Sequence, residues 1–331
     1  MRRTLFTLLR LAVGIGVLAY LVNSKIINLH ALSRLISVWP ISLAAVGLLL
    51  IDLGLMALRL CCLFRPQGLH LGWSDSLRLT ALSSFFASFL PGRAGGDLVK
   101  IFYASKENSG RRTEIVAVLL FDRALGLFSL LLLPLLLAPF FPDLLRLMAI
   151  RVGLSIMAFL ALGMVSAFLA CLLAPALVGR LLAWSNKLLP GEVAGRFLGT
   201  VGAYGRRPGM LAGALGISLA DNLMGIGILA LALLAVNPAS LAARLCVLVP
   251  IGQIVNSLPF TPGGLGVGET AFHALFSIAG LKGGADALLC WRVWNVLVGV
   301  LGLIVYLRGF QARIFEVLPD RAGALNMPPN S

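Results

Sequence analysis

The sequence predicts an all-α, polytopic membrane protein with about six spanning helices and two opposed re-entrant helical hairpins that form an inverted repeat. The first observation is composition: 59% of the 331 residues are hydrophobic and 12% are charged, whereas soluble domains are about half apolar and a quarter charged. The second is a series of apolar runs of membrane length. The third is a pair of further apolar regions that proline and glycine interrupt. We treat 1–331 as a single transmembrane domain.

Spanning helices are predicted where about 20 apolar residues follow one another. Six runs qualify: about 4–22, 41–62, 114–138, 150–174, 209–236 and 286–308. The first run follows Met1-Arg2-Arg3 and lacks an A-x-A-like cleavage site, so we expect a retained helix that starts in the cytoplasm. No polar stretch is long enough for a large soluble catalytic domain, and we expect no enzyme activity.

The two interrupted regions are 76–105 and 243–280. Their breaks read Leu90-Pro91-Gly92-Arg93-Ala94-Gly95-Gly96-Asp97 and Leu258-Pro259-Phe260-Thr261-Pro262-Gly263-Gly264. Proline removes a backbone donor and glycine weakens a helix. In hydrocarbon, non-helical backbone is tolerated only where protein or a cavity surrounds it. Each region is therefore predicted to be a pair of half-helices, either re-entrant or broken.

The basic residues distinguish these two arrangements. If both regions are re-entrant, fourteen Lys and Arg residues lie on the cytoplasmic side and four on the other, with Arg151 and Arg244 at boundaries. If both regions crossed fully, the basic segment 175–208 would lie outside. Cytoplasmic loops are enriched in Lys and Arg, so the re-entrant arrangement is favoured, with both termini cytoplasmic. Segment 175–208 is then either an amphipathic interfacial helix or a connector, and 312–331 is a tail.

An internal repeat relates the interrupted regions. Pro91-x-x-x-Gly95-Gly96 matches Pro259-x-x-x-Gly263-Gly264. Arg123 follows Gly96 by 27 residues and Arg292 follows Gly264 by 28, each inside the next apolar helix. The repeat halves 76–138 and 243–308 would enter from opposite sides. Inverted repeats with discontinuous helices place the substrate near the bilayer midplane.

Ionisable side chains inside the spans are candidates for substrate binding, because a charge at a helix centre costs at least ~2.5–3.5 kcal/mol. Arg123 is too deep for easy snorkelling, whereas Arg292 is nearer its helix start and able to snorkel. At each Gly-Gly turn, free N–H groups and the positive helix end suit a phosphate. The candidate substrate-binding residues are Pro91, Gly95, Gly96, Asp97, Lys100, Asp122, Arg123, Gly263, Gly264, Glu269, His273, Arg292 and Asn295.

Spacing suggests how some of these residues act. Asp97 and Lys100 share a helix face, and Glu269 and His273, four residues apart, are able to pass a proton. Asp122 and Arg123 are adjacent on a helix, do not face each other, and should meet different partners. The alternative is that these charges only pair with one another and hold the hairpins.

A second group of polar residues is interpreted as bridges between membrane helices. It consists of Asp52, Arg59, Asp221, Asn222, Gln253 and Asn256, with Arg59 alternatively placed at the cytoplasmic headgroups. Four tryptophans near predicted helix ends are interpreted as interface anchors. They are Trp39, Trp73, Trp291 and Trp294.

Several other classes of function are excluded. The net charge of +14 lies in short loops, which favours anionic lipid headgroups over nucleic acid. The five cysteines contain no CxxC pair, so neither a disulfide framework nor a zinc site is expected. No H-E-x-x-H, G-x-S-x-G or P-loop is present, and we expect no metal or cofactor.

Two motifs resemble those of a known family. The run Leu90–Lys100, followed by Leu120-Phe121-Asp122-Arg123-Ala124-Leu125-Gly126, is similar to the membrane region of lysylphosphatidylglycerol synthetases and to flippase-like proteins that consist of that region alone. The later run Pro262–Glu269 resembles the family's G-L-G-V-R-E motif. The likeness covers nearly the whole chain. Gly268 stands where the family has arginine, which leaves one cation fewer for an anionic headgroup.

The resemblance implies a multi-pass protein of the bacterial inner membrane that translocates a lipid headgroup. The implied lipids are an anionic phospholipid, aminoacylated phosphatidylglycerol, a hopanoid or a polyprenyl lipid, and a lipid-synthesis enzyme is an implied partner. The soluble aminoacyl-transferase domain is missing, so lipid lysylation is not expected. Two alternatives remain: a proton- or ion-coupled transporter of a small solute that uses Glu269 and His273, and a non-transporting partner of a lipid-modifying enzyme.

Overall fold

The computed structural model describes residues 37–87, 94–106, 111–178, 191–240, 242–257, 266–307 and 316–317. Five long helices dominate this part of the chain: α3 (Trp39–Phe64), α6 (Arg112–Leu137), α8 (Met148–Leu173), α11 (Pro208–Val236) and α14 (Gly284–Leu307). By length and composition, each is able to cross a membrane. Five of the six predicted spans are thus confirmed as long apolar helices, and the sixth, 4–22, lies outside the described residues.

Shorter elements connect the long helices. The short α-helices are α4 (Trp73–Ala87), α5 (Ala94–Lys106), α7 (Pro142–Leu145), α10 (Gly191–Gly205), α12 (Leu245–Asn256) and α13 (Val267–Ile278). Single 3-10 turns cover Arg65–Gln67, Ala138–Phe140 and Pro238–Ser240. Strands β1 (Leu69–His70) and β2 (Glu316–Val317) form one antiparallel pair, so part of the predicted tail 312–331 returns to the end of α3.

Both regions predicted to be interrupted contain two short helices. Helix α4 ends at Ala87 and α5 begins at Ala94, while α12 ends at Asn256 and α13 begins at Val267. The helices of each pair contact each other. Gly266 fixes the start of α13, because its φ of +79° favours glycine and its N–H donates to Glu269 Oε2 at 2.7 Å.

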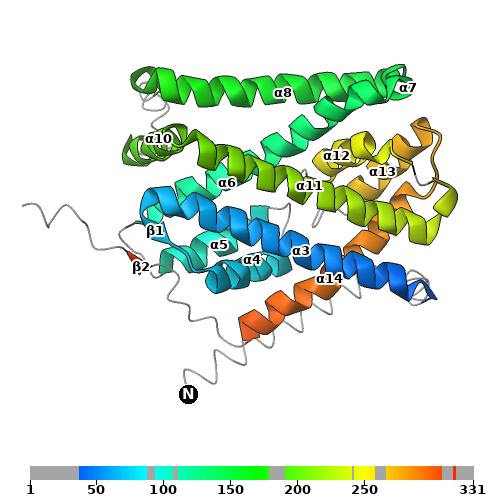
Figure 1. The fold of residues 1–331 in the computed structure, drawn as a ribbon, viewed down its shortest axis with the longest axis horizontal. Coiled ribbons are helices and arrows are strands. Elements are labelled where there is room, and N and C mark those ends of the chain that lie inside the picture. The colour runs from blue at the N-terminus through cyan, green and yellow to red at the C-terminus, as the bar shows by residue number, and fades with distance from the viewer. Residues whose placement is uncertain are drawn as a thin grey trace, which may run out of the picture.

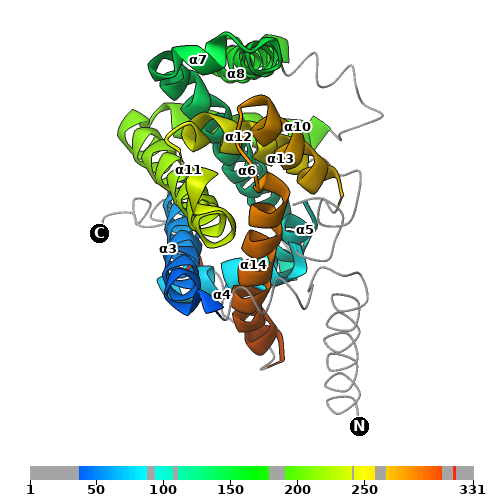
Figure 2. The ribbon, with the colours of Figure 1, turned by 90° about the vertical axis from the view of Figure 1, so that its right-hand side faces the viewer.

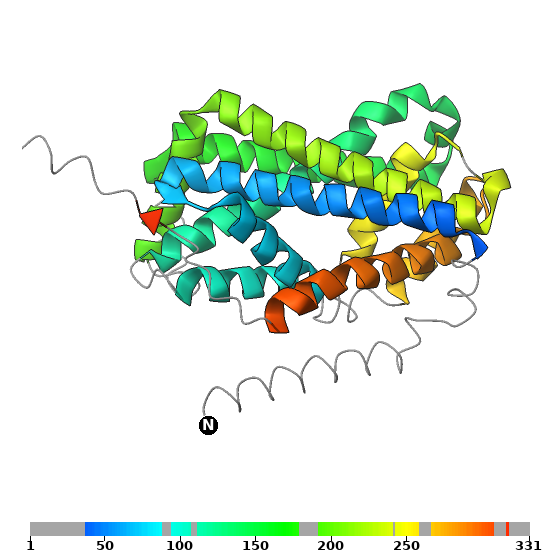
Figure 3. The ribbon, with the colours of Figure 1, turned by 60° about the horizontal axis from the view of Figure 1, so that its bottom comes forward.

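The two short-helix pairs lie toward opposite ends of the long helices (Figures 1 and 3). The pair α4–α5 lies at the end where α3 finishes, and Ser76 Oγ of α4 donates to the Ala57 carbonyl of α3 at 2.7 Å. The pair α12–α13 lies at the other end, where Arg244, just before α12, approaches Asp143 of α7 at 3.3 Å.

Apolar side chains form two separate cores, one at each end. One core joins the end of α3 to α4, α10 and the first half of α6, with Leu60, Leu79 and Val118 fully buried. The other joins α12, α13 and α14 to the far halves of α6 and α11, with Leu229, Leu248 and Phe272 fully buried. The polar layer described below therefore lies between two apolar cores.

Helix α8 lies at the edge of the bundle and α6 runs through it (Figure 2). In the apolar stretch of α8 only 11% of the residues are buried, whereas in that of α6 56% are buried. Large apolar side chains of α8 are exposed, among them Phe159 and Leu162. In a bilayer these side chains contact lipid, as expected for a membrane helix at the periphery of a bundle.

The structure corrects two predictions about single side chains. Trp294 is fully buried, so its interpretation as an interface anchor is wrong, whereas Trp39 and Trp73 are more than half exposed. Arg59 is buried and does not lie at the headgroups, because its guanidinium pairs with Asp122. All five cysteines are free thiols.

Helix α10 covers the second half of segment 175–208 and packs on the bundle. Its Tyr204 is fully buried, stacks on Phe121 of α6 at 4.3 Å and donates to the Leu63 carbonyl at 2.8 Å. Burial and the nearby Asp122 charge raise the pKa of the Tyr204 hydroxyl. Residues 179–190 lie outside the described residues, and the interfacial-helix and connector readings of this segment both stay predictions.

Candidate functional site

Polar residues from four long helices lie near the middle of each helix. Asp52 is the fourteenth of 26 residues in α3, and Asp122 is the eleventh of 26 in α6. Asp221 is the fourteenth of 29 in α11, and Asn295 is the twelfth of 24 in α14. Because the four helices run side by side, these groups form one polar layer at mid-length.

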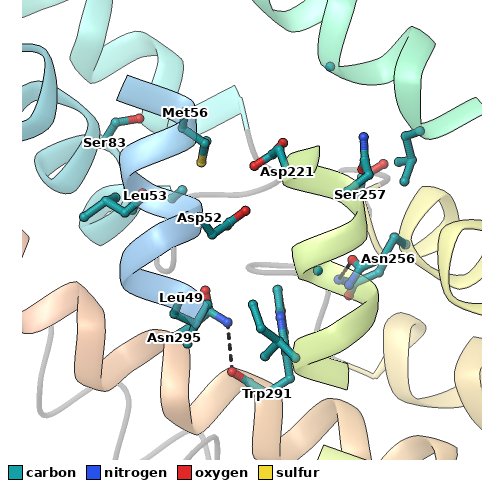
Figure 4. Close-up of a pocket in the computed structure, with 18 of the residues that line it drawn as sticks. Leu49, Asp52, Leu53, Met56, Ser83, Asp221, Asn256, Ser257, Trp291 and Asn295 are labelled. Carbon is teal, nitrogen blue, oxygen red and sulfur yellow. Dashed lines mark hydrogen bonds between the residues drawn. The ribbon is translucent and has the colours of Figure 1, made fainter. Parts of the chain in front are cut away.

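The polar layer surrounds a cavity of about 280 Å³ (Figure 4). In Figure 4, Asp52 on α3 and Asp221 on α11 point toward each other across it. Ser83 near the end of α4 and Ser257 just after α12 also line the cavity, so both short-helix pairs reach it. Its charged lining residues are Asp52, Arg59, Lys100, Asp122, Arg123, Asp221 and Arg292.

Arg59 is the centre of a first network that joins α3, α6 and α11. Its Nε donates to Asp122 Oδ1 at 2.7 Å, and its Nη1 donates to Ser218 Oγ at 2.9 Å. Asp221 of α11 lies 3.7 Å from Nη1, and Asp52 acts on the same guanidinium electrostatically. We predicted that Asp122 and Arg123 have different partners. For Asp122 this is confirmed, because its carboxylate pairs with Arg59.

Arg292 is the centre of a second network that joins α12, α13 and α14. Its Nε donates to Glu269 Oε1 at 2.8 Å, and its Nη2 donates to Asn256 Oδ1 at 2.9 Å. Arg292 is buried, so the prediction that it is able to snorkel to the interface is wrong. Gly268 makes the network possible, because a Cβ there would lie 2.9 Å from Arg292 Nη2 and even closer to Asn256 Oδ1.

Lys100 and Arg123 bring two further positive charges to the cavity. Lys100 on α5 is only 3% exposed. Both cations act electrostatically on the Asp122 carboxylate. Gly96, one turn before Lys100, lets α5 approach α4 closely, since a Cβ there would lie 2.6 Å from the Ser83 carbonyl oxygen.

The structure gathers part of the predicted site. Of the predicted residues, those that line the cavity are Lys100, Asp122, Arg123, Arg292 and Asn295. Glu269 does not line the cavity but forms an ion pair with Arg292, which does. His273 is exposed on α13 and is not among the lining residues. Gly95 and Asp97 lie in the first turn of α5, where the Asp97 side chain is outside the described structure. Pro91, Gly263 and Gly264 lie outside the described residues.

Sequence reasoning ranked several lining residues too low. Arg59, Asn222 and Asn256 do bridge helices, as predicted: Asn222 donates to Ser129 Oγ of α6 at 2.8 Å. All three also line the cavity, together with Asp52, Asp221 and Gln253. For Asp52, Asp221 and Asn222, the position at the middle of an apolar run was the available signal, because a polar group at that depth is costly and is usually retained for a role.

The interpretation of Trp291 as an interface anchor is also wrong. Its position near the start of α14 suggested an interface anchor, yet it lines the cavity between α11 and α14 (Figure 4). Asn295, one turn later, donates to the Trp291 carbonyl at 2.9 Å. Among the described residues, no group of three His, Cys, Asp or Glu side chains is arranged to hold a metal ion.

Comparison with known families identifies the chain. A model of the lysylphosphatidylglycerol synthase TM region matches residues 7–302. The chain belongs to this family. Membership confirms the resemblance seen in the sequence and indicates a lipid-related role in the membrane. A comparison with curated proteins found no match, and a comparison with solved structures found none.

Proposed function

We propose that this chain is a lipid flippase of the bacterial inner membrane, which moves a polar or anionic phospholipid headgroup across the bilayer without covalent chemistry. The observation that carries the proposal is the charged cavity at the middle of helices of membrane length. Charged residues at that depth are costly and are usually retained for a substrate path. Family membership supports a lipid as the substrate.

The two short-helix pairs are proposed to be opposed re-entrant hairpins of an inverted repeat. Their placement toward opposite ends of the bundle supports this arrangement (Figure 1). Their inner ends, near Ser83 and Ser257, both reach the cavity. Transporters with such repeats bind substrate at the repeat interface and alternate its access between the two sides.

The anionic part of the headgroup is proposed to bind at Lys100 and Arg123. Both line the cavity, and Lys100 is almost completely removed from bulk solvent. A charge-assisted bond from arginine to a phosphate oxygen is strong and directional. The acids Asp122 and Asp221 already interact with Arg59 of α3, at 2.7 and 3.7 Å.

The cavity volume fits a headgroup and not a whole lipid. About 280 Å³ lies at the lower limit of small-molecule pockets, which span about 300–1,000 Å³. We infer that the acyl chains remain in the bilayer while the headgroup occupies the cavity.

The proposed orientation places the end of α3 in the cytoplasm, together with both termini. Arginines gather at this end: Arg111 donates to the Gln67 carbonyl at 2.7 Å, and Arg206 and Arg207 lie between α10 and α11. Cytoplasmic enrichment of Lys and Arg supports the orientation. Labelling of single cysteines at exposed loop positions from either side of intact cells tests it.

The test of transport is reconstitution of the purified protein into vesicles with fluorescent phosphatidylglycerol. Addition of a membrane-impermeant reductant reports how much headgroup has moved. We expect rapid movement by the wild type and a loss of about 100-fold in the Lys100→Ala/Arg123→Ala double variant, if two charge-assisted bonds of ~1.5 kcal/mol each are lost. The matched control is Arg146→Ala, an arginine of the α7–α8 turn outside the cavity.

The outcomes separate the alternatives. Normal transport by the double variant would overturn the assigned cation pair. Proton flux that depends on a water-soluble substrate would instead indicate a solute transporter. Absence of transport by the wild type, together with a stable lipid-modifying enzyme recovered from the same membranes, would indicate a non-transporting partner.

A further inference from the structure

Arg59, which lines the cavity, has hydrogen-bond partners on two other long helices, Asp122 on α6 and Ser218 on α11. Its Nε and Nη2 donate to the two oxygens of Asp122 at 2.7 and 3.4 Å, and its Nη1 donates to Ser218 Oγ at 2.9 Å. Its side chain is 5% exposed, and that of Asp122 is 8% exposed. The two-pronged contact fixes the orientation of the carboxylate as well as its distance.

Gly126 completes a socket for the Arg59 guanidinium on α6. It lies one turn after Asp122, and a Cβ at this position would be 3.4 Å from Nη1 and 3.6 Å from Nη2. The Asp122-x-x-x-Gly126 pattern thus provides a carboxylate and an open space on the same helix face. A Cβ alone would be in ordinary van der Waals contact with the guanidinium, whereas a side chain much larger than alanine would compete with it for this space.

Arg123 follows Asp122 directly and lines the cavity. Adjacent residues on a helix point about 100° apart, because one turn contains 3.6 residues. Once Arg59 holds Asp122 against α3, the rotation of α6 about its axis is set. The direction in which Arg123 projects is set with it.

We propose that Arg59 is a positioning residue, which acts through Asp122 to aim Arg123 into the cavity. Asp122 then contributes to the site through Arg59 and not through contact with the headgroup. Ser218 and Asp221 extend the same control to α11. The inference rests on the proposed function only in naming a headgroup as the ligand of Arg123.

The charges around Arg59 shape the choice of variants. Asp122 and Asp221 contact it, Asp52 acts on it from its own helix, and Lys100 and Arg123 act on Asp122. Replacing Arg59 alone leaves a buried carboxylate unpaired. The double variant Arg59→Gln/Asp122→Asn removes both charges and keeps groups able to form hydrogen bonds.

The first readout does not depend on transport. In a chain without its native cysteines, Arg123→Cys is labelled with a water-soluble thiol reagent, with and without Arg59→Gln/Asp122→Asn. We expect labelling to slow by about tenfold in the combined variant, because thiol reactivity falls with lost exposure. An unchanged labelling rate would overturn the proposal even if the protein transports no phospholipid.

The second readout separates positioning from a purely structural role. Each single variant, Arg59→Gln or Asp122→Asn, should lower the thermal midpoint, and the double variant should recover it. Fluorescent phosphatidylglycerol transport should stay lowered by about 100-fold in the double variant, as expected for a misplaced binding group. If transport recovers together with stability, Arg59 is only structural. If the wild type transports no phosphatidylglycerol, the proposed function fails while the labelling result still decides the positioning role.

A steric perturbation gives a matched control pair. Gly126→Leu should lower transport by about tenfold, since its side chain extends beyond a Cβ that already contacts the guanidinium and overpacking costs about 1–3 kcal/mol. Gly163→Leu on α8 adds the same side chain at a position where a Cβ would meet nothing within 4 Å and should leave transport unchanged. Equal effects of the two substitutions would overturn the socket.

Discussion

In both halves of the predicted repeat, a charged residue lies 23 positions before an intramembrane arginine, but the sign of that charge differs between the halves. In the first half, Lys100 on α5 precedes Arg123 on α6 by 23 residues; in the second half, Glu269 on α13 precedes Arg292 on α14 by the same 23 residues. The second half therefore neutralises its arginine through an ion pair of 2.8 Å. The first half places two cations at the corresponding positions, and both line the cavity.

A second difference lies in the helices that each arginine network joins. Arg59 connects α3, α6 and α11, which are all long enough to span the membrane. Arg292 connects α14 to α12 and α13, which have 12 residues each. The first network ties the frame of the bundle together, whereas the second ties a short-helix pair to that frame. In the proposed transport cycle, we infer that the second network is the one whose contacts change.

The largest expected effect concerns the stability of the two networks. Arg59→Met should lower the free energy of unfolding by about 3–5 kcal/mol, because it leaves buried Asp122 unpaired. Arg292→Met should cost less, about 1–3 kcal/mol, because Glu269 is 17% exposed and keeps its bond from the Gly266 N–H. Unfolding by sodium dodecyl sulfate in mixed micelles measures both. If Arg292→Met lowered the free energy of unfolding as much as Arg59→Met or more, the proposed difference between the Arg59 network and the Arg292 network would be wrong.

A charge swap tests the difference between the halves directly. Lys100→Glu should give the first half the arrangement of the second, with an acid 23 residues before the arginine. Fluorescent phosphatidylglycerol transport should fall by about 100-fold, since a like charge facing the phosphate costs several kcal/mol. Lys100→Gln, which removes the charge without reversing it, is the control and should have an intermediate effect. Transport that survives Lys100→Glu would place the anion elsewhere.

The glycine before Glu269 gives an effect of intermediate size. Gly268→Ala should lower the free energy of unfolding by about 1–3 kcal/mol through overpacking, because the new methyl group displaces Asn256 or Arg292. The control, Gly163→Ala, should be neutral or stabilising by about 0.5–1 kcal/mol, the usual gain for alanine in a helix. A stabilising Gly268→Ala would show that the second network readily rearranges.

The smallest effect distinguishes the two acids around Arg59. Asp221→Asn should cost about 1 kcal/mol or less, because Asp221 lies 3.7 Å from the guanidinium and is 19% exposed. Asp122→Asn should cost about 3 kcal/mol, the value for breaking a buried pair. The same detergent unfolding assay measures both variants. The reverse order would make Asp221 the main partner of Arg59.

Local sequence patterns were sufficient for the helices and their breaks. The runs 114–138 and 209–236 match α6 and α11 within a few residues, because about 20 apolar residues specify a membrane helix by themselves. The breaks also follow from local chemistry, since Pro91 and Pro259 cannot donate a backbone hydrogen bond and neighbouring glycines weaken the helix.

The site was only partly predictable, because its residues come from distant parts of the chain. Lys100, Asp122, Arg123, Arg292 and Asn295 were expected from their depth, and the structure places them around one cavity. The pairing of Arg59 with Asp122, 63 residues away, has no local signature. Nor does its bond to Ser218, 159 residues away.

The sequence by itself determined that this protein is a membrane-embedded helical bundle with charged residues at mid-depth. Hydrophobic period and length are local properties, and a bilayer leaves few alternatives to a helix. Only the tertiary structure decided which arginine is held by which acid, and that Trp294 is buried and not an anchor. The physical reason is that a polar group in an apolar medium takes whichever partner the packing of neighbouring helices brings within reach.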